Sequence, residues 1–150
     1  MTSVSEIVGV DIDLRRCHAW SSTRGKLCYK ASLAELVKVI QDSSIHATFV
    51  VECASPHIWG AKENQGMVYN KLRWTIWNSY AIGVLSTIED RRLFVSPSST
   101  WKHSWQEDEM MKILGIKGDN HDIRQCRAMV AMNTMHPKDW IPINTFMEKL

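Results

Sequence analysis

The chain contains no apolar stretch that approaches the roughly 20 residues needed to cross a bilayer. Its first residues also lack the basic-then-apolar order of a secretory signal. Four cysteines are present, but none forms a C-x-x-C pair and most lie in apolar segments, which favours reduced, buried thiols over disulfides or zinc ligands. We therefore expect a soluble cytoplasmic protein that makes no membrane contact.

The sequence also has no internal repeat, low-complexity tract or linker. Its 150 residues are 45% hydrophobic and 23% charged, which suits one globular domain over residues 1–150. The formal net charge is only +2, whereas a general polyanion binder would be more basic. Any nucleic-acid surface must therefore come from the local placement of Lys and Arg.

Hydrophobic periodicity and turn signals predict the order of the secondary-structure elements. Three strands come first, then a helix, a strand, a long helix, a further strand and two more helices. The expected strands are 6–12, 15–21, 26–31, 46–52 and 91–96. The expected helices are 32–40, 66–90, 107–114 and 120–132, and the first of them begins with Ser32 and Glu35 as a capping box. This order predicts an α/β protein with a mixed sheet, in which a meander is followed by parallel crossover strands.

The long helix at 66–90 carries two apolar rows. One row contains Val68, Leu72, Ile76, Tyr80, Val84 and Ile88, and the other contains Met67, Trp74, Trp77, Ala81 and Leu85. So wide an apolar face indicates burial on two sides, against the sheet and against a second partner. Ala81 and Gly83 would allow another backbone to approach closely. A charge at Trp74 or Trp77 is expected to test the second face, although the sequence does not decide which row faces the sheet.

Four carboxylates stand where hydrophobic segments end or pack, on three elements far apart in the chain: Asp11, Glu52, Asp119 and Asp122. Asp and Glu are rarely buried unless a positive group neutralises them. Sites built from several carboxylates and only oxygen ligands suit hard divalent cations such as Mg²⁺. Together these acids predict metal-dependent phosphodiester chemistry.

Each acid also has a simpler explanation. Asp11 could cap the turn that follows its strand, a role that suits Asp13 better. Glu52 ends a strand, where ligand sites form in open α/β sheets, yet a surface glutamate is common there. Asp119 and Asp122 share one helix face at spacing i, i+3 and would also serve as plain helix caps.

The order and spacing of five features resemble those of the RuvC-like Holliday-junction resolvases, in the compact forms that phages carry. The features are an apolar strand with Asp (VGVDI), a strand that ends in Glu (FVVEC), a long helix after a loop, a Pro-x-x-x-Trp-Lys element (PSSTWK, 97–102) and a late Asp-x-x-Asp helix (DNHD, 119–122). They span residues 6 to about 132. The resemblance implies a ribonuclease H-like fold with a mixed five-stranded sheet flanked by helices.

The resemblance also implies roles for particular residues. In such families the first Asp, the strand-end Glu and the paired Asp bind two Mg²⁺ ions, for which Mn²⁺ substitutes, and this role passes to Asp11, Glu52, Asp119 and Asp122. The basic residue after the Pro element assists at the scissile phosphate, which implicates Lys102.

DNA contacts are expected from the loop after the strand-end Glu and from basic residues near the site. Related resolvases use an aromatic residue of this loop, where the present chain has SPHIWGAK at 55–62. Its aromatic and apolar side chains would wedge or stack where bases are exposed at a junction, and the alternative is a tryptophan folded back onto the core. The expected DNA contacts are His57, Ile58, Trp59, Lys62, Arg15, Arg16 and Trp101.

Two residues depart from the family's pattern or have no assigned role. The first strand of such resolvases usually continues Asp-Pro-Gly or Asp-x-Gly, whereas this chain has Asp13 at the glycine position. Asp13 therefore either adds to the site or replaces the turn glycine. His121 is expected at the surface or behind the ligands.

The function expected from the sequence is that of a Mg²⁺-dependent endonuclease that resolves Holliday junctions and other branched DNA as a homodimer through helix 66–90, in the bacterial host cytoplasm if a phage encodes it. A ribonuclease H-like nuclease of RNA–DNA hybrids or flaps is one alternative, and the second apolar helix face argues against it. A non-catalytic DNA-binding module is the other, and the four acids argue against that.

Overall fold

The computed structural model describes residues 5–53, 65–97, 112, 115–116, 120–133 and 140–149. The elements, in chain order, are β1 (Ile7–Asp13), β2 (Arg16–Ser21), β3 (Gly25–Ala31), α1 (Leu33–Asp42), β4 (Thr48–Cys53), α2 (Gln65–Leu85), β5 (Arg92–Pro97), α5 (His121–Asn133), β6 (Ile141–Pro142) and α6 (Ile143–Glu148). The expected capping of the first helix is present, since the Ser32 side chain accepts a hydrogen bond from the Glu35 backbone N–H.

The strands form one mixed sheet with the order β3-β2-β1-β4-β5-β6. β1, β2 and β3 are an antiparallel meander, and β4 and β5 run parallel to β1. The expected α/β class is therefore confirmed, but the sheet has six strands and not five. The additional strand, β6, is a two-residue antiparallel edge that contains Pro142. Proline usually interrupts regular secondary structure, but edge strands tolerate it, so Pro142 does not prevent this pairing.

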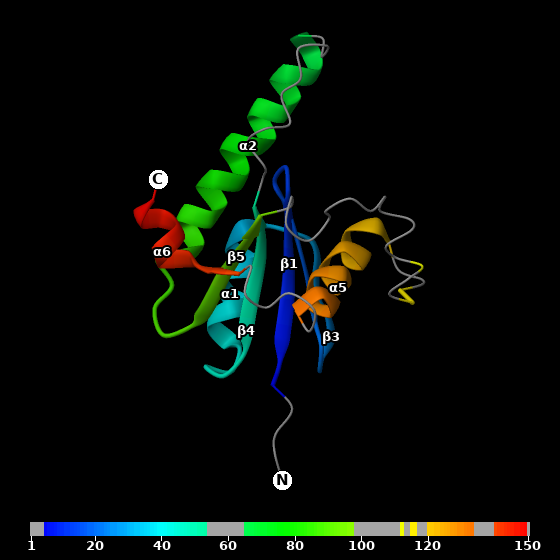
Figure 1. Cartoon of the computed structure of the whole chain (residues 1–150), viewed down its shortest axis with the longest axis vertical. Helices are drawn as coiled ribbons and strands as arrows, with labels where there is room; N and C mark the ends of the chain where they lie inside the picture. Colours follow the sequence, from blue (N-terminus) through cyan, green and yellow to red (C-terminus); the bar gives the residue numbers. More distant parts are fainter. Residues whose placement is uncertain are drawn as a thin grey trace.

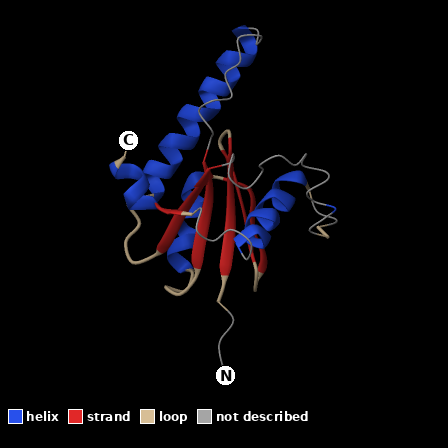
Figure 2. Ribbon diagram, viewed as in Figure 1, coloured by secondary structure: helices blue, strands red, loops and turns tan. Residues whose placement is uncertain are grey.

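Helices cover both faces of the sheet (Figures 1 and 2). On one face, Val8, Val10 and Ile12 of β1 pack into a core to which α1 and α2 contribute. On the other face, Val50 of β4 packs with Ala128 and Met129 of α5. The alternation of side chains along each strand thus divides the apolar residues between two cores.

Gly9 allows α5 to lie directly on the sheet. A Cβ atom added at Gly9 would lie 2.2 Å from the backbone oxygen of Cys126, in the middle of α5. No other residue type leaves room for this approach, because a real Cβ never comes so close to a backbone atom. Gly9 therefore sets the distance between β1 and α5.

α2 projects beyond the sheet as a long, single helix (Figure 1). It ends at Leu85 and not at Asp90 as expected. Its Leu85 is buried in the core, whereas Ile76 and Tyr80 are about 60% exposed. Among the described residues of α2, Trp74 and Trp77 thus face the rest of the molecule, whereas Leu72, Ile76 and Tyr80 of the other row face outward.

This orientation corrects three expectations about the second face of α2. Ala81 is fully buried in the core, and a Cβ added at Gly83 would face Met147 of α6, so neither residue is available for another chain. Trp77 packs against the core, and Trp74 lines a cleft described below. A charge at either tryptophan would therefore disturb the fold or the cleft, and would not test an outer face.

The cysteines agree with the expectation of reduced thiols. Cys17, Cys28, Cys53 and Cys126 are free thiols. Burial, the largest cause, raises the pKa of Cys17 to about 12 and those of Cys28 and Cys53 to about 11, which keeps these thiols protonated. Among the helices that the structure describes, none combines the length and the apolar character needed to span a membrane.

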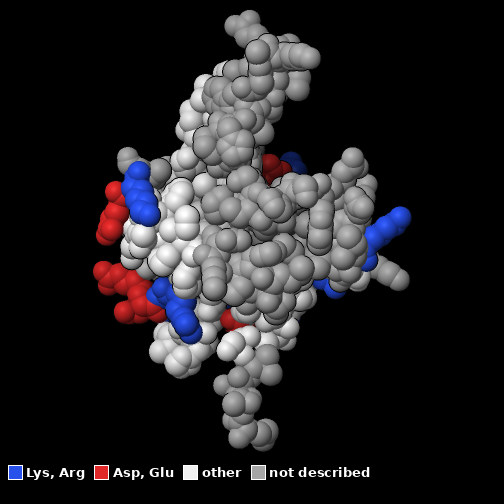
Figure 3. Space-filling model, in the orientation of Figure 1, with Lys and Arg blue, Asp and Glu red and all other residues white. Residues whose placement is uncertain are grey.

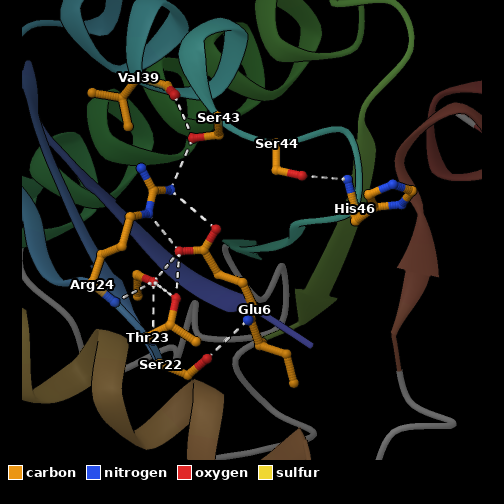
Figure 4. Close-up of polar contacts among 10 residues, drawn as sticks. Glu6, Ser22, Thr23, Arg24, Val39, Ser43, Ser44 and His46 are labelled. Carbon is orange, nitrogen blue, oxygen red and sulfur yellow. Dashed lines mark hydrogen bonds and ion pairs between the residues drawn. The ribbon is translucent and has the colours of Figure 1, made fainter. Parts of the chain in front are cut away.

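A polar network closes the end of the sheet where β1 begins (Figure 4). The Glu6 carboxylate accepts hydrogen bonds from Arg24, Ser21 and Thr23, and Arg24 also donates to the Ser43 hydroxyl after α1. Burial raises the pKa of Glu6, but the hydrogen bonds and the charge of Arg24 outweigh it, so the pKa lies below its ordinary 4.5. The network ties the start of β1 to the β2–β3 turn and to α1.

We predict that Gly9→Ala destabilises the protein by about 1–3 kcal/mol, the usual cost of overpacking, because α5 must move away from β1. Gly83→Ala is the matched control: its Cβ would meet only Met147 at 3.8 Å, and alanine in a helix is neutral or favourable by up to about 1 kcal/mol. Urea unfolding of both variants measures the difference. Equal free energies of unfolding for the two variants would contradict the close approach.

We predict that Glu6→Gln lowers the free energy of unfolding by about 1–3 kcal/mol at pH 7, because hydrogen bonds to a charged group are lost. Since the folded-state pKa is depressed, this stabilisation is complete above the ordinary value of 4.5 and disappears as the pH falls through the folded pKa. Urea unfolding between pH 7 and pH 3 should therefore show the gap between wild type and variant closing at acid pH. Glu89→Gln, an exposed control, should stay within about 0.5 kcal/mol.

Candidate functional site

Polar residues form a line across the sheet, on the face that α5 covers. Asp11 of β1 pairs with His18 of β2, and Glu52 of β4 pairs with Ser96 of β5. β1 and β4 pair up to Val10 and Val51, so one further step in the same register puts Asp11 beside Glu52. Because paired residues share a sheet face, these side chains come from different strands to one place.

α5 brings a further carboxylate to this line. Its N-cap is Asn120, whose side chain accepts a hydrogen bond from the backbone N–H of Ile123 at 3.0 Å. Asp122, in the first turn, is therefore not needed as the cap. One carboxylate oxygen each of Asp11 and Asp122 and one ring nitrogen of His18 lie within 4.8 Å of one another.

The acids open into a cleft of about 240 Å³ beside the carboxyl end of β4. Its lining residues, which come from β1, β4, α2 and α5, are Asp11, Asp13, Glu52, Trp74, His121, Asp122 and Gln125. Asp13 lines the cleft, and its side chain also accepts a hydrogen bond from the Leu14 backbone N–H in the turn after β1. His121 is exposed at the rim and lies 3.1 Å from the Gln125 amide, as expected for a surface position.

Glu52 is held in place by α2. Its side chain is only 3% exposed, and its backbone carbonyl accepts a hydrogen bond from the amide of Asn78, which is also buried. A buried carboxylate is costly unless a positive group or a cation compensates it. Asn78 was not foreseen from the sequence, although an amide in an apolar helix row is a signal for such a contact.

The donor set fits a hard divalent cation. Asp11, Glu52 and Asp122 supply carboxylate oxygens at one cleft, and Mg²⁺ and Mn²⁺ prefer such ligands. The carboxylates also gain from a cation, because it relieves the repulsion among like charges. The site thus has the chemistry to bind a metal ion and to present it to a ligand in the cleft.

His18 is the main site residue that sequence reasoning missed. It is fully buried, and its Nδ1 accepts a hydrogen bond of 3.1 Å from the backbone N–H of Lys30. Its Nε2 lies 3.5 Å from Asp122 Oδ2. Burial lowers the pKa of His18 and outweighs Asp122 and Asp13, which raise it, so the neutral ring is favoured. The two-residue turn after β1 was a usable signal, because it fixes the register that pairs position 18 with position 11.

Most of the other expected site residues lie outside the residues that the structure describes: Asp119, Lys102, His57, Ile58, Trp59, Lys62 and Trp101. Arg15 lines a separate cavity of about 330 Å³ between the β1–β2 turn and α2, together with Arg73, Trp77 and Tyr80. Arg16 is exposed and pairs with Asp13 at the end of β1. Its charge acts on His18, so Arg16 flanks the acidic cleft.

A basic and aromatic surface lies beside the acids, on β2, β3 and α5. Lys26 and Lys30 lie over the ring of Tyr29, at 5.8 and 5.2 Å from its centroid, and Arg127 lies over Trp20 at 5.4 Å. Figure 3 shows Lys and Arg atoms at the edge beside α5, and further Lys and Arg atoms on the opposite side of that face, next to most of its acidic atoms. The Tyr29 ring also contacts His18, with centroids 5.3 Å apart, which connects this surface to the site.

Comparison with solved structures identifies the fold. The chain is similar to the Thermus thermophilus RuvC in complex with Holliday junction substrate, with a TM-score of 0.53, 11% identity and coverage of 90% of this chain and 96% of that one. It is also similar to a second Thermus thermophilus RuvC structure, with a TM-score of 0.50, 12% identity and coverage of 91% and 99%. No family model and no curated protein matches the sequence. The fold is thus RuvC-like, in the ribonuclease H-like class, as the sequence predicted.

We predict that Mn²⁺ raises the melting temperature of the wild-type protein but not that of Asp11→Asn. Binding to the folded state stabilises it by mass action, by about 2.7 kcal/mol at 100 times Kd. In chelator, Asp11→Asn should be at least as stable as wild type, because one like charge is removed from the cluster. Thermal unfolding with and without Mn²⁺ measures both effects. Asp42→Asn, an exposed control outside the cleft, should respond to Mn²⁺ as wild type does, and an equal response of Asp11→Asn would exclude it as a ligand.

Proposed function

We propose that this protein is a Mg²⁺-dependent endonuclease that cuts branched DNA, with four-way junctions as its main substrate. The observation that carries the proposal is the convergence of Asp11, Glu52 and Asp122 at one cleft of a RuvC-like fold. A DNA phosphate is the group that a metal-bearing acidic cleft beside a basic surface can accept.

The candidate residues have separate roles in the proposed reaction. Asp11, Glu52 and Asp122 would hold the metal ions, with Asp119 as the proposed fourth ligand. Two Mg²⁺ ions, when bound, supply activation of a water molecule and stabilisation of the leaving 3′ oxygen. Asn78 keeps Glu52 at the cleft by fixing its backbone, and Lys102 is proposed to stabilise the charge that develops on the phosphate.

DNA would approach over β2, β3 and α5. Arg16, Lys26, Lys30 and Arg127 place positive charge along this side, next to the acids. Cations of this kind position phosphates and give binding that weakens with salt. The loop residues His57, Ile58, Trp59 and Lys62, together with Trp101 and Arg15, remain proposed contacts at the branch point.

We also propose that the protein acts as a homodimer through the outer face of α2. Four large apolar side chains form an exposed stripe, the α2 stripe: Tyr69, Leu72, Ile76 and Tyr80. Contiguous exposed apolar residues of this size mark interaction surfaces. A second copy, related by two-fold symmetry, would cover the stripe and place two clefts for cuts in opposed strands of a junction.

We predict that Asp122→Asn lowers cleavage of a four-way junction by at least roughly 10²-fold, on the scale of losing one essential electrostatic contact. Junction binding should be unchanged or tighter, because a negative charge near phosphate is removed. Single-turnover cleavage and gel-shift binding measure the two effects, and Asp42→Asn should cleave at the wild-type rate.

The substrate panel tests the wider proposal. Four-way junctions, three-way junctions, flaps and RNA–DNA hybrids are compared with wild-type protein in Mg²⁺. Preferential cutting of hybrids would favour a ribonuclease H-like activity. Junction binding without cutting of any substrate would indicate a non-catalytic DNA-binding module.

We predict that Ile76→Glu converts a wild-type dimer into a monomer at micromolar concentration, because it buries an unpaired charge in the interface. Sedimentation velocity measures the mass, and circular dichroism confirms that α2 remains folded. Gln41→Glu, on the exposed side of α1, should remain dimeric. A wild-type protein that sediments as a monomer with and without junction DNA would eliminate the dimer.

A further inference from the structure

The two ring nitrogens of His18 face different groups, one a hydrogen-bond donor and the other an acceptor. Nδ1 faces the backbone N–H of Lys30 at 3.1 Å, and a backbone N–H is only a donor. Nε2 lies 3.5 Å from Asp122 Oδ2, a little beyond the roughly 2.7–3.2 Å of an ordinary N–H···O hydrogen bond. Among the described residues, this buried nitrogen has no hydrogen-bond partner at normal distance. The Asp122 carboxylate is therefore the described acceptor to which Nε2 can donate a hydrogen bond.

The Lys30 contact decides where the ring proton lies. Because Nδ1 accepts a hydrogen bond, it cannot carry the proton, and a neutral imidazole must then carry it on Nε2. A protonated Nε2 has no lone pair for a metal ion. Although His18 lies among potential ligands, its tautomer makes it a donor.

We propose that His18 is a positioning residue that holds Asp122 through Nε2–H, and that it is not a metal ligand. This inference rests on the proposed function, since it assumes that Asp122 binds the metal. Partners of this kind orient metal-binding groups, and their loss typically costs about 10–100-fold in metal affinity or activity. His18 would thus keep one carboxylate oxygen of Asp122 directed toward Asp11.

The surrounding structure is arranged to hold the ring. Lys30 adopts a left-handed backbone conformation with φ of 51°, which is costly for a side-chain-bearing residue. The β2–β3 pairing shifts register on either side of Ala19, next to His18. Such irregularities redirect groups near functional sites, and here one strand's backbone N–H points to a side chain. The Tyr29 ring lies tilted beside the imidazole and limits its rotation.

The test compares His18→Gln with His18→Leu. The glutamine amide nitrogen can occupy the place of Nε2 and donate to Asp122, whereas leucine cannot donate. Mn²⁺ affinity, measured by calorimetry, should fall about 10–100-fold in His18→Leu, and His18→Gln should restore most of it. His46→Leu, an exposed histidine far from the cleft, is the control and should bind Mn²⁺ as wild type does.

A spectroscopic measurement separates a positioning residue from a ligand and does not depend on the variants folding. Electron spin echo spectra of wild-type protein with Mn²⁺ should show no nitrogen in direct coordination. A directly bound ¹⁴N that persists in His121→Leu, where the other histidine of the cleft is removed, would overturn the inference and leave the proposed nuclease site intact. Wild-type Mn²⁺ affinity in His18→Leu would do the same. A wild-type protein that binds no Mn²⁺ would overturn both.

Discussion

The contact between Gly9 and α5 is the constraint on which the candidate site depends. Asp11 lies two residues beyond Gly9 on the same sheet face, and Asp122 lies one helical turn before Cys126 on α5. Because the helix backbone meets the strand at Gly9, the two carboxylates come close enough to share a cation. A side chain at position 9 would separate the strand from the helix and increase the distance between these two carboxylates.

The site combines carboxylates with nearby cations and hydrogen-bond donors. Its carboxylates repel one another and are stable together only with positive charge or hydrogen-bond donors nearby. A buried neutral histidine and the cations of Arg16, Lys26 and Lys30 stand on the same side. Among the described residues that line the cleft, none is a lysine or an arginine, so no described side chain of this kind competes with a metal for the carboxylates.

α2 links the core, the cleft and the outer surface. Leu85 anchors its C-terminal half in the core, and Asn78 and Trp74 reach the end of β4 and the cleft. The α2 stripe faces away from all of these. One helix therefore fixes the backbone of a candidate ligand on one side and carries exposed apolar side chains on the other.

The sequence by itself indicated the α/β class, the order of the elements from β1 to β5 and α5, and the acids Asp11, Glu52 and Asp122, because periodicity, turn residues and carboxylates in apolar segments are local signals. The expected helix at 107–114 and Asp119 lie almost wholly outside the residues that the structure describes. The sequence did not predict α6. It did not reveal β6, whose two residues are too short for any pattern, or which row of α2 is buried, since both rows are equally apolar. Only the tertiary structure placed His18 and Asn78 at the site. Their roles arise from strand register and from helix packing, which bring together residues that have no relation along the chain.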